Sequence, residues 1–437
     1  MEWYYALLII FGGLILFMMT GMPVAFAFLL VNVIGVLIWW GGPSGLEQLI
    51  GSIHRSVTTF TYLPFPMFVL MGEVMFRSGL GTNMIEALDK WLGRVPGRLG
   101  LLAIVGGTLV ATLSGSGQAS VALLGSTLVP EMEKRGYKKP MSLGPVLGSG
   151  GLAVMIPPSN LAVILGALAM ISIGKLLIAI IIPGLLMAVF YTIYTVGRAW
   201  LQPHLAPPYD VPPTPFQEKL KSAARDILPL SLVVFAVTGL IFLGVATPSE
   251  ASACGALVTF GLAAATGKIG WKATKQTAMT AVRTSVMVLF IIAGATAFSQ
   301  ILAFSGASKG LVSFILSVQL PPLGAVFAMM VILLILGMFI NATAIMMITI
   351  PIFMPIVKSI GVDPVWFGVL YLLNMEMGGT TPPFGLYLFV MKGIAPPGVT
   401  LEDCIRAAFP YLICDFCVLM LILVLPPVAL WLPGLMT

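Results

Sequence analysis

The sequence predicts an all-α polytopic membrane protein, built as an inverted repeat with five crossings plus one re-entrant hairpin per half. Three observations support this class: the composition, the recurrence of helix breakers at a fixed distance, and the charge of the loops. Of the 437 residues, 59% are hydrophobic and 9% are charged, and the mean hydropathy is +1.06. Soluble domains carry about 25% charged residues, and a membrane barrel would need much shorter, alternating segments of ~10 residues.

Helix breakers in the second half repeat those of the first half at one offset of 225 positions. The pairs that share it are Pro23 and Pro248, Ser116 and Asn341, Pro130 and Pro355, and Pro157-Pro158 and Pro382-Pro383. Internal repeats of this length are typical of secondary transporters.

The charge of the loops predicts that the two halves are inverted. Basic residues cluster in the loop 86–98, whereas its counterpart 311–323 has no charge. Conversely, the basic segment 266–283 matches the weakly charged segment 41–55. Positive loops face the cytoplasm, so matching loops lie on opposite sides. The formal net charge of +6 is therefore attributed to topology rather than to nucleic-acid binding, and both termini are predicted to be periplasmic.

Each half is expected to contain five crossings and one hairpin. The crossings are 3–19, 22–40, 63–80, 140–172 (broken) and 175–198, and then 226–246, 248–266, 284–305, 360–395 (broken) and 407–432. The hairpins are 99–132 and 321–358, whose arms of about 15 residues reach only to the bilayer midplane. The first repeat spans 1–201 and the second 226–437. A Pro-rich cytoplasmic linker, expected to be extended, joins them at 202–225, and the segment 41–62 is expected to be a loop.

Each half has two helix breaks at midplane depth. They are Ser114–Gly117, Gly148–Asn160, Gly337–Thr343 and Met377–Gly385. A broken helix exposes carbonyls at the end of one arm and amides at the start of the next. Carbonyl and hydroxyl oxygens suit a dehydrated Na⁺ ion, and helix starts attract an anion. The breaks therefore predict two cation sites with an anionic substrate between them. The alternative is that these small residues only allow close helix packing.

Residues at the breaks or directly beside them are the candidates for substrate contact. They are Ser116, Gly117, Ser159, Asn160, Asn341, Glu376 and Thr381. Glu376 is preferred among the acids, because buried ionisable residues in membranes are usually functional. Glu250 is interpreted as a helix cap, and Glu73 and Asp415 as packing or partner contacts.

Enzyme motifs are not found in the sequence. Gly267-Lys268 lacks the spaced glycine and the hydroxyl of a P-loop. His54 and His204, both expected in loops, lie 150 positions apart and do not predict a metal site. Cys414 and Cys417 form a C-x-x-C inside an apolar run, which favours small core residues over a redox pair. Residues 3–19 lack the basic start of a signal peptide.

At the same breaks, the chain resembles the large membrane subunit of TRAP transporters, the DctM family. The resemblance rests on six motifs: Gly21-Met22-Pro23-Val24-Ala25-Phe26, Ser114-Gly115-Ser116-Gly117, Ile156-Pro157-Pro158-Ser159, Ala246-Thr247-Pro248-Ser249-Glu250-Ala251, Asn341-Ala342-Thr343 and Thr380-Thr381-Pro382-Pro383. These motifs span nearly the whole chain.

The resemblance implies a Na⁺-driven elevator in the bacterial inner membrane that imports a small carboxylate or sulfonate. It also implies two partners, a small four-helix membrane subunit and a periplasmic substrate-binding protein. Carried over by motif, one Na⁺ site would involve Ser114, Ser116, Gly151, Met155 and Pro157. The other would involve Gly337, Asn341, Thr343, Met377 and Thr380. A stand-alone Na⁺/anion symporter and an ion channel stay open as alternatives.

Overall fold

The protein folds entirely into helices over the part of the chain that the computed structural model describes, which is 2–436 without 94, 210–213 and 268. The α-helices of the first half are α1 (Trp3–Met19), α2 (Val24–Trp39), α3 (Pro43–Val57), α4 (Pro64–Arg77), α5 (Leu80–Trp91), α6 (Arg98–Ser114), α7 (Gly117–Lys134), α8 (Lys139–Met155), α9 (Asn160–Ala169), α10 (Ile173–Ala179) and α11 (Ile181–Leu201). Those of the second half are α12 (Phe216–Ser222), α13 (Leu228–Phe242), α14 (Pro248–Ala265), α15 (Trp271–Phe304), α16 (Ala307–Ser317), α17 (Pro322–Gly337), α18 (Ala342–Ser359), α19 (Pro364–Thr380), α20 (Leu386–Ile394), α21 (Leu401–Val424) and α22 (Pro427–Leu430).

Several helices are long and apolar enough to cross a membrane. Within the described residues, five do so singly, and the count rises to seven if each bent pair is one span. One bent pair is α8 and α9, which meet at 41°, and the other comprises α3 and the segment Phe60–Arg77, which meet at 48°. A polytopic helical membrane protein with broken spans is thus confirmed. The count of ten crossings and their orientation remain predictions.

Helix boundaries recur between the halves at the offset of the helix breakers. Adding 225 to the bounds of α7 gives those of α18, and adding it to the bounds of α8 gives those of α19. The Pro-Pro bonds that follow α8 and α19 are both cis. The same backbone path is therefore specified twice at the positions where the sequence places its breaks.

The segment 41–62, expected as a loop, is largely helical. Residues Pro43–Val57 form α3, which includes His54. The helix starts with a proline at its first position, where the missing amide costs nothing. The expectation of a loop was wrong, because the scattered polar residues of this stretch are spaced for an amphipathic helix. In the same way, α15 starts at Trp271 and absorbs most of the predicted loop 266–283.

The linker is only partly extended. Residues 210–213 lie outside the described part of the chain, and Phe216–Ser222 form α12, which continues through a π-helical turn, Ala223–Ile227, into α13. The prediction of an extended linker was therefore wrong from Phe216 onward. The prolines stop at Pro215, and the Gln, Glu, Lys, Leu and Ala residues that follow have high helix propensity.

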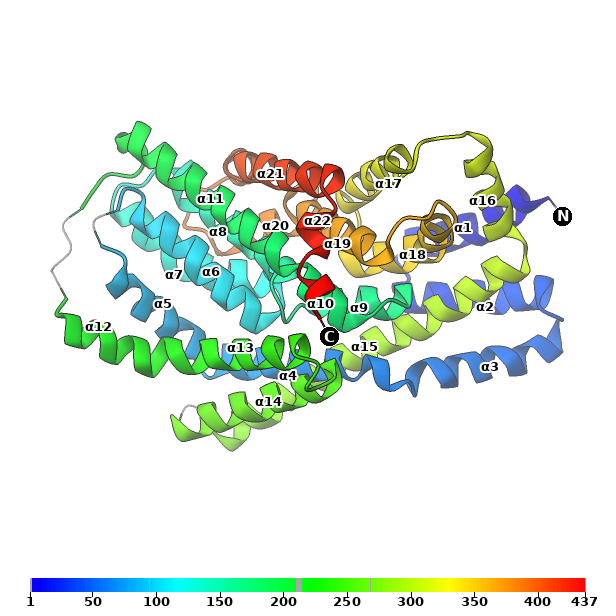
Figure 1. Ribbon diagram of the computed structural model, residues 1–437, viewed down its shortest axis with the longest axis horizontal. Helices are drawn as coiled ribbons and strands as arrows, with labels where there is room; N and C mark the ends of the chain where they lie inside the picture. The colour runs from blue at the N-terminus through cyan, green and yellow to red at the C-terminus, as the bar shows by residue number, and fades with distance from the viewer. Residues whose placement is uncertain (1, 94, 210–213, 268, 437) are drawn as a thin grey trace.

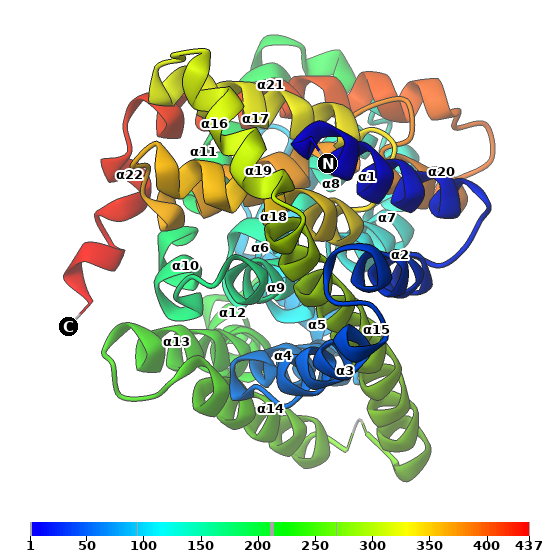
Figure 2. The same ribbon diagram turned by 90° about the vertical axis from the view of Figure 1, so that its right-hand side faces the viewer.

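The helices form two bodies that face each other. In both views, α3, α4, α13 and α14 lie along one side of the molecule (Figures 1 and 2). The hairpins and broken helices gather above them, with α8 packed against α6, α7, α19 and α21. The outgoing arm of each hairpin contacts the short arm of the other half's broken helix, so that α7 meets α20 and α18 meets α9.

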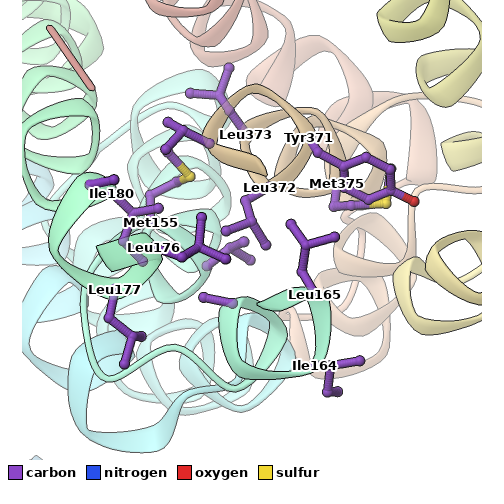
Figure 3. Close-up of a cluster of buried hydrophobic side chains, with 14 of the residues drawn as sticks. Met155, Ile164, Leu165, Leu176, Leu177, Ile180, Tyr371, Leu372, Leu373 and Met375 are labelled. Atoms are coloured by element: carbon purple, nitrogen blue, oxygen red, sulfur yellow. The ribbon is translucent and has the colours of Figure 1, made fainter. Parts of the chain in front are cut away.

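A large apolar core joins the two broken helices. Figure 3 shows α8–α11 side chains such as Met155 and Leu176 directed toward Leu372 on α19. These three side chains are fully buried. By contrast, α1 exposes Leu8, Leu16 and other apolar side chains, as is expected of a lipid-facing surface. The core therefore holds the helix breaks in place from behind.

Candidate functional site

A cleft of about 740 Å³ lies between the two bodies. One wall comes from α4 and α15, which contribute Phe65, Val69, Gly72, Glu73, Phe76, Thr284, Met287 and Val288. The opposite wall consists mainly of the two hairpin tips and the starts of α9 and α20. The cleft thus brings the breaks of both halves to one space, although they lie more than 200 residues apart in the chain.

The first hairpin turns within two residues. Its incoming arm α6 ends at Ser114, and α7 starts at Gly117. Gly115 has a φ of +59°, a conformation that glycine adopts without strain. Ser116 is extended and caps α7, accepting the Ala119 amide at 3.4 Å. The turn therefore depends on a glycine and on a capping hydroxyl, as the break in the sequence implied.

The first broken helix is bonded to this tip. Asn160 starts α9, and its Nδ2 donates to the Gly115 carbonyl at 3.4 Å. The preceding Ser159 caps α9 by accepting the Ala162 amide at 3.3 Å. Behind the tip, a Cβ on Gly117 would lie 2.7 Å from the Gly150 carbonyl of α8. The tip and the break thus form one unit with closely packed backbones.

The second hairpin is built in the same way. Asn341 caps α18, and its Oδ1 accepts the Ala344 amide at 3.0 Å. Gly337, at the end of α17, packs directly on Gly378 of α19, since a Cβ on either would lie 3.0 Å from the other's Cα. Two capped helix starts, those of α7 and α18, therefore open into the same cleft. Each presents the free amides and partial positive charge of a helix N-terminus.

The break between α19 and α20 has its hydroxyls turned inward. Thr380 and Thr381 both donate to the Met377 carbonyl, at 3.1 and 2.6 Å. Both side chains are buried. In this arrangement the Met377 carbonyl, in the last turn of α19, accepts two hydrogen bonds from hydroxyl groups, while the hydroxyl oxygens keep acceptor capacity for a cation.

The predicted site residues separate into two groups. Those that line the cleft are Ser116, Gly117, Asn160, Gly337, Asn341 and Thr343. Those that lie outside its lining are Gly151, Met155, Pro157, Ser159, Glu376, Met377, Thr380 and Thr381. The Ser114 backbone ends α6, but its side chain is outside the described part of the structure. All residues of the second group are buried, and their role in ion binding stays a prediction.

Glu376 does not reach the cleft. Its side chain is fully buried and covers Gly151 of α8, where a Cβ would lie 1.5 Å from its Oε1. Beside it lies Asp415 of α21, which accepts a hydrogen bond from the Tyr191 hydroxyl. The Glu376 side chain packs against Gly151 of α8 and is not part of the cleft lining, so this structure shows no path for a direct contact between Glu376 and a substrate in the cleft. Asp415 is likewise part of the core, at 1% exposure.

Several lining residues were not among the candidates. Gln118 and Tyr387 line the cleft on the side of the hairpins, and Glu73 and Thr284 line the facing wall. Gln118 directly follows the first break, which could have suggested it. Glu73 was expected to make a packing or partner contact, since a single acid within a span does not indicate which way it faces. Thr284 carries no signal in the sequence.

Comparisons with known proteins agree with this architecture. A family model described as "Tripartite ATP-independent periplasmic transporter, DctM component" matches residues 11–428. The C4-dicarboxylate TRAP transporter large permease protein DctM of Pseudomonas aeruginosa is 32% identical over 395 residues, which is 90% of each chain. The isethionate TRAP transporter permease protein DctMQ of Oleidesulfovibrio alaskensis is 30% identical, over 98% of this chain and 66% of its own length.

Among solved structures, the YdaH transporter of Alcanivorax borkumensis is similar in fold. The TM-score is 0.63 at 15% identity, with 89% of each chain covered. This similarity concerns the fold alone. The family model matches nearly the full chain. The protein therefore belongs to the DctM family, the large permease components of tripartite ATP-independent periplasmic transporters, and is a multi-pass membrane transport protein rather than an enzyme.

Proposed function

We propose that this permease imports a small organic anion, a carboxylate or a sulfonate, coupled to Na⁺, by an elevator movement in the bacterial inner membrane. The observation that carries the proposal is the pair of capped helix starts, α7 and α18, which open into one cleft from the two halves. Helix starts favour an anion. The carbonyl, hydroxyl and amide oxygens behind them are ligands suited to a hard cation.

The cleft geometry favours a moving body over a fixed pore. The hairpins and broken helices pack on one another, and the cleft opens between their tips and the facing helices α4 and α15, which contact α6, α9 and α18 outside it. A body held together in this way can shift as a unit against the facing wall. In a channel, the filter would instead be fixed. The inverted repeat of 1–201 and 226–437 would supply the two end states.

Two partners belong to the proposal. A small four-helix DctQ-like subunit would bind in the membrane, and the fused DctMQ relative supports this. A periplasmic binding protein would deliver the substrate. Uptake into proteoliposomes separates the alternatives: uptake without the binding protein would favour a stand-alone symporter, and flux without saturation or Na⁺ dependence would indicate a channel.

Removing the capping oxygens at the cleft tests the cation sites. We expect Ser116→Ala and Asn341→Ala each to raise the Na⁺ concentration for half-maximal uptake about tenfold, or ~1.4 kcal/mol, because each removes an oxygen next to a predicted ion site. The measurement is the initial uptake rate into proteoliposomes as a function of Na⁺ concentration.

Loss of a helix cap by itself needs a matched control. Ser172 caps α10 by accepting the Lys175 amide at 3.3 Å, and it does not line the cleft. Ser172→Ala should lower the free energy of unfolding by about 1 kcal/mol, as the loss of the cap does in Ser116→Ala and Asn341→Ala. It should leave Na⁺ activation unchanged. Unaltered Na⁺ activation in both cleft variants would contradict the two-site proposal.

A further inference from the structure

The charge of the cleft is unusual for a protein that carries anions. Among the described residues that line it, there is no Lys, Arg or His, and the only acidic side chain is that of Glu73. A dianion would leave its second negative group without a cationic partner here. It would also face a carboxylate, and like charges at short range are unfavourable.

Glu73 lines the cleft, and its cationic partner Arg77 does not. Its Oε2 accepts from Arg77 Nε at 2.9 Å, one turn further along α4. Arg77 also reaches across to α15, donating to Gln276 Oε1 at 3.3 Å and to Thr280 Oγ1 at 3.2 Å. Arg77 is not part of the lining. The guanidinium is thus anchored on α15, and only the acidic member of the pair lines the cleft.

The ion pair with Arg77 leaves the Glu73 carboxylate able to accept further hydrogen bonds. The side chains of Glu73 and Arg77 are 27% and 32% exposed. Ion pairs four residues apart on a helix are weak at such exposure, at a few tenths of a kcal/mol. A carboxylate oxygen has further acceptor capacity. Glu73 can therefore bind a second cationic group without losing Arg77.

The two walls of the cleft then have opposite character. On one wall, the starts of α7 and α18 offer amides to an anion. On the other, Glu73 offers a negative charge. Exposed aromatic rings complete the lining, including Phe76, Phe339 and Phe384, and aromatic faces attract cations.

We propose that the substrate is a zwitterion, a carboxylate or sulfonate that also carries a positively charged nitrogen. The acidic group binds at the helix starts of the hairpins, and the nitrogen binds at Glu73 on α4. This inference rests on the proposed function, because it uses the same cleft. It narrows the substrate class from small organic anions in general to molecules whose net charge is close to zero.

The test uses probe pairs that differ only in the cationic group. Taurine and isethionate share one skeleton, with an ammonium group in place of a hydroxyl, and 4-aminobutyrate and 4-hydroxybutyrate form a second pair. Binding to the full-length purified permease is measured by its thermal shift, with saturating Na⁺ and with Na⁺ replaced by K⁺, which carries no ammonium group that could compete at Glu73. At least one amine probe should bind about tenfold more tightly than its hydroxyl partner.

Variants of the pair on α4 should change this preference in opposite directions. Glu73→Gln keeps the side-chain shape and should abolish the preference, lowering amine affinity about tenfold with hydroxyl affinity little changed. Arg77→Gln leaves Glu73 without its partner and should increase the preference. Glu250→Gln is the matched control, because that carboxylate caps α14 at Thr247 and does not line the cleft.

The outcomes separate this inference from the proposed function. If hydroxyl and amine probes bind equally and with Na⁺ dependence, the zwitterion proposal is wrong and the anion importer stands. An amine preference that survives in Glu73→Gln would also overturn it. If no probe of either pair binds, with or without Na⁺, both proposals fail for this cleft.

Discussion

Gly151→Ala should severely impair the protein, both in stability and in transport. A Cβ at this position would lie 1.5 Å from Glu376 Oε1 and 2.2 Å from its Cδ. The glutamate is fully buried, so it has no open space into which it can turn. Overpacking in a core costs about 1–3 kcal/mol and occasionally more. We expect a lower thermal unfolding midpoint of the purified protein and strongly reduced uptake.

A glycine of α14 provides the matched control. Gly261 is also helical, but a Cβ there would meet nothing within 4 Å. Gly261→Ala should leave uptake unchanged and stabilise slightly, because alanine is favoured over glycine in a helix by up to ~1 kcal/mol. The double variant Gly151→Ala/Glu376→Ala should recover part of the loss. If Gly151→Ala and Gly261→Ala had equal effects on uptake and on the unfolding midpoint, the close contact between α8 and α19 would not be essential.

The sequence has a glycine at position 151, but its structural role could not be predicted from the sequence. Gly148–Gly151 was read as part of a helix break, whereas α8 runs unbroken to Met155. The glycines serve close packing instead: Gly148 lies under Tyr411, and Gly151 under Glu376. A cluster of glycines is compatible with a helix break and with close packing between helices. Only the position of the neighbouring helices distinguishes these two roles. The actual break follows at the proline pair.

Much of the helix pattern could be predicted, because breakers act locally. Proline ends a helix by removing a donor and by steric clash, and its effect does not depend on tertiary contacts. The ends of α8 and α19 next to Pro157 and Pro382 followed from this. The errors at α3 and α12 lie where no breaker acts. There, amphipathic spacing and helix propensity outweigh the polarity that suggested loops.

Less of the site could be predicted, because which way a residue faces is a tertiary property. Ser116 and Asn341 cap helices that open into the cleft, and their capping role is local. By contrast, Glu376 and Glu73 both interrupt apolar helices. Burial against α8 places the first in the core, and the gap between the two bodies places the second on the cleft wall. Periodicity within one helix cannot distinguish these fates.

Tyr191→Phe is expected to destabilise the protein, with the second largest effect after Gly151→Ala. The Tyr191 hydroxyl donates to Asp415 Oδ1, and both residues are buried. Beside them lies Glu376, so the substitution removes a donor from a pair of buried acidic groups. An acidic group that loses its hydrogen bond in a core costs about 2–3 kcal/mol. The thermal unfolding midpoint should fall clearly, although the cleft residues are untouched.

Tyr371→Phe is the matched comparison, because its partner is neutral. The Tyr371 and Thr349 hydroxyls lie 2.7 Å apart, and Thr349 also donates to the Ile345 carbonyl at 2.9 Å. Thr349 keeps that second bond in the variant, so the loss should be only about 1 kcal/mol. A larger loss of stability for Tyr191→Phe than for Tyr371→Phe would show that the pair Asp415 and Glu376 depends on the Tyr191 hydroxyl of α11. Equal effects would mean that Asp415 and Glu376 stabilise each other without it, and that α11 contributes packing alone.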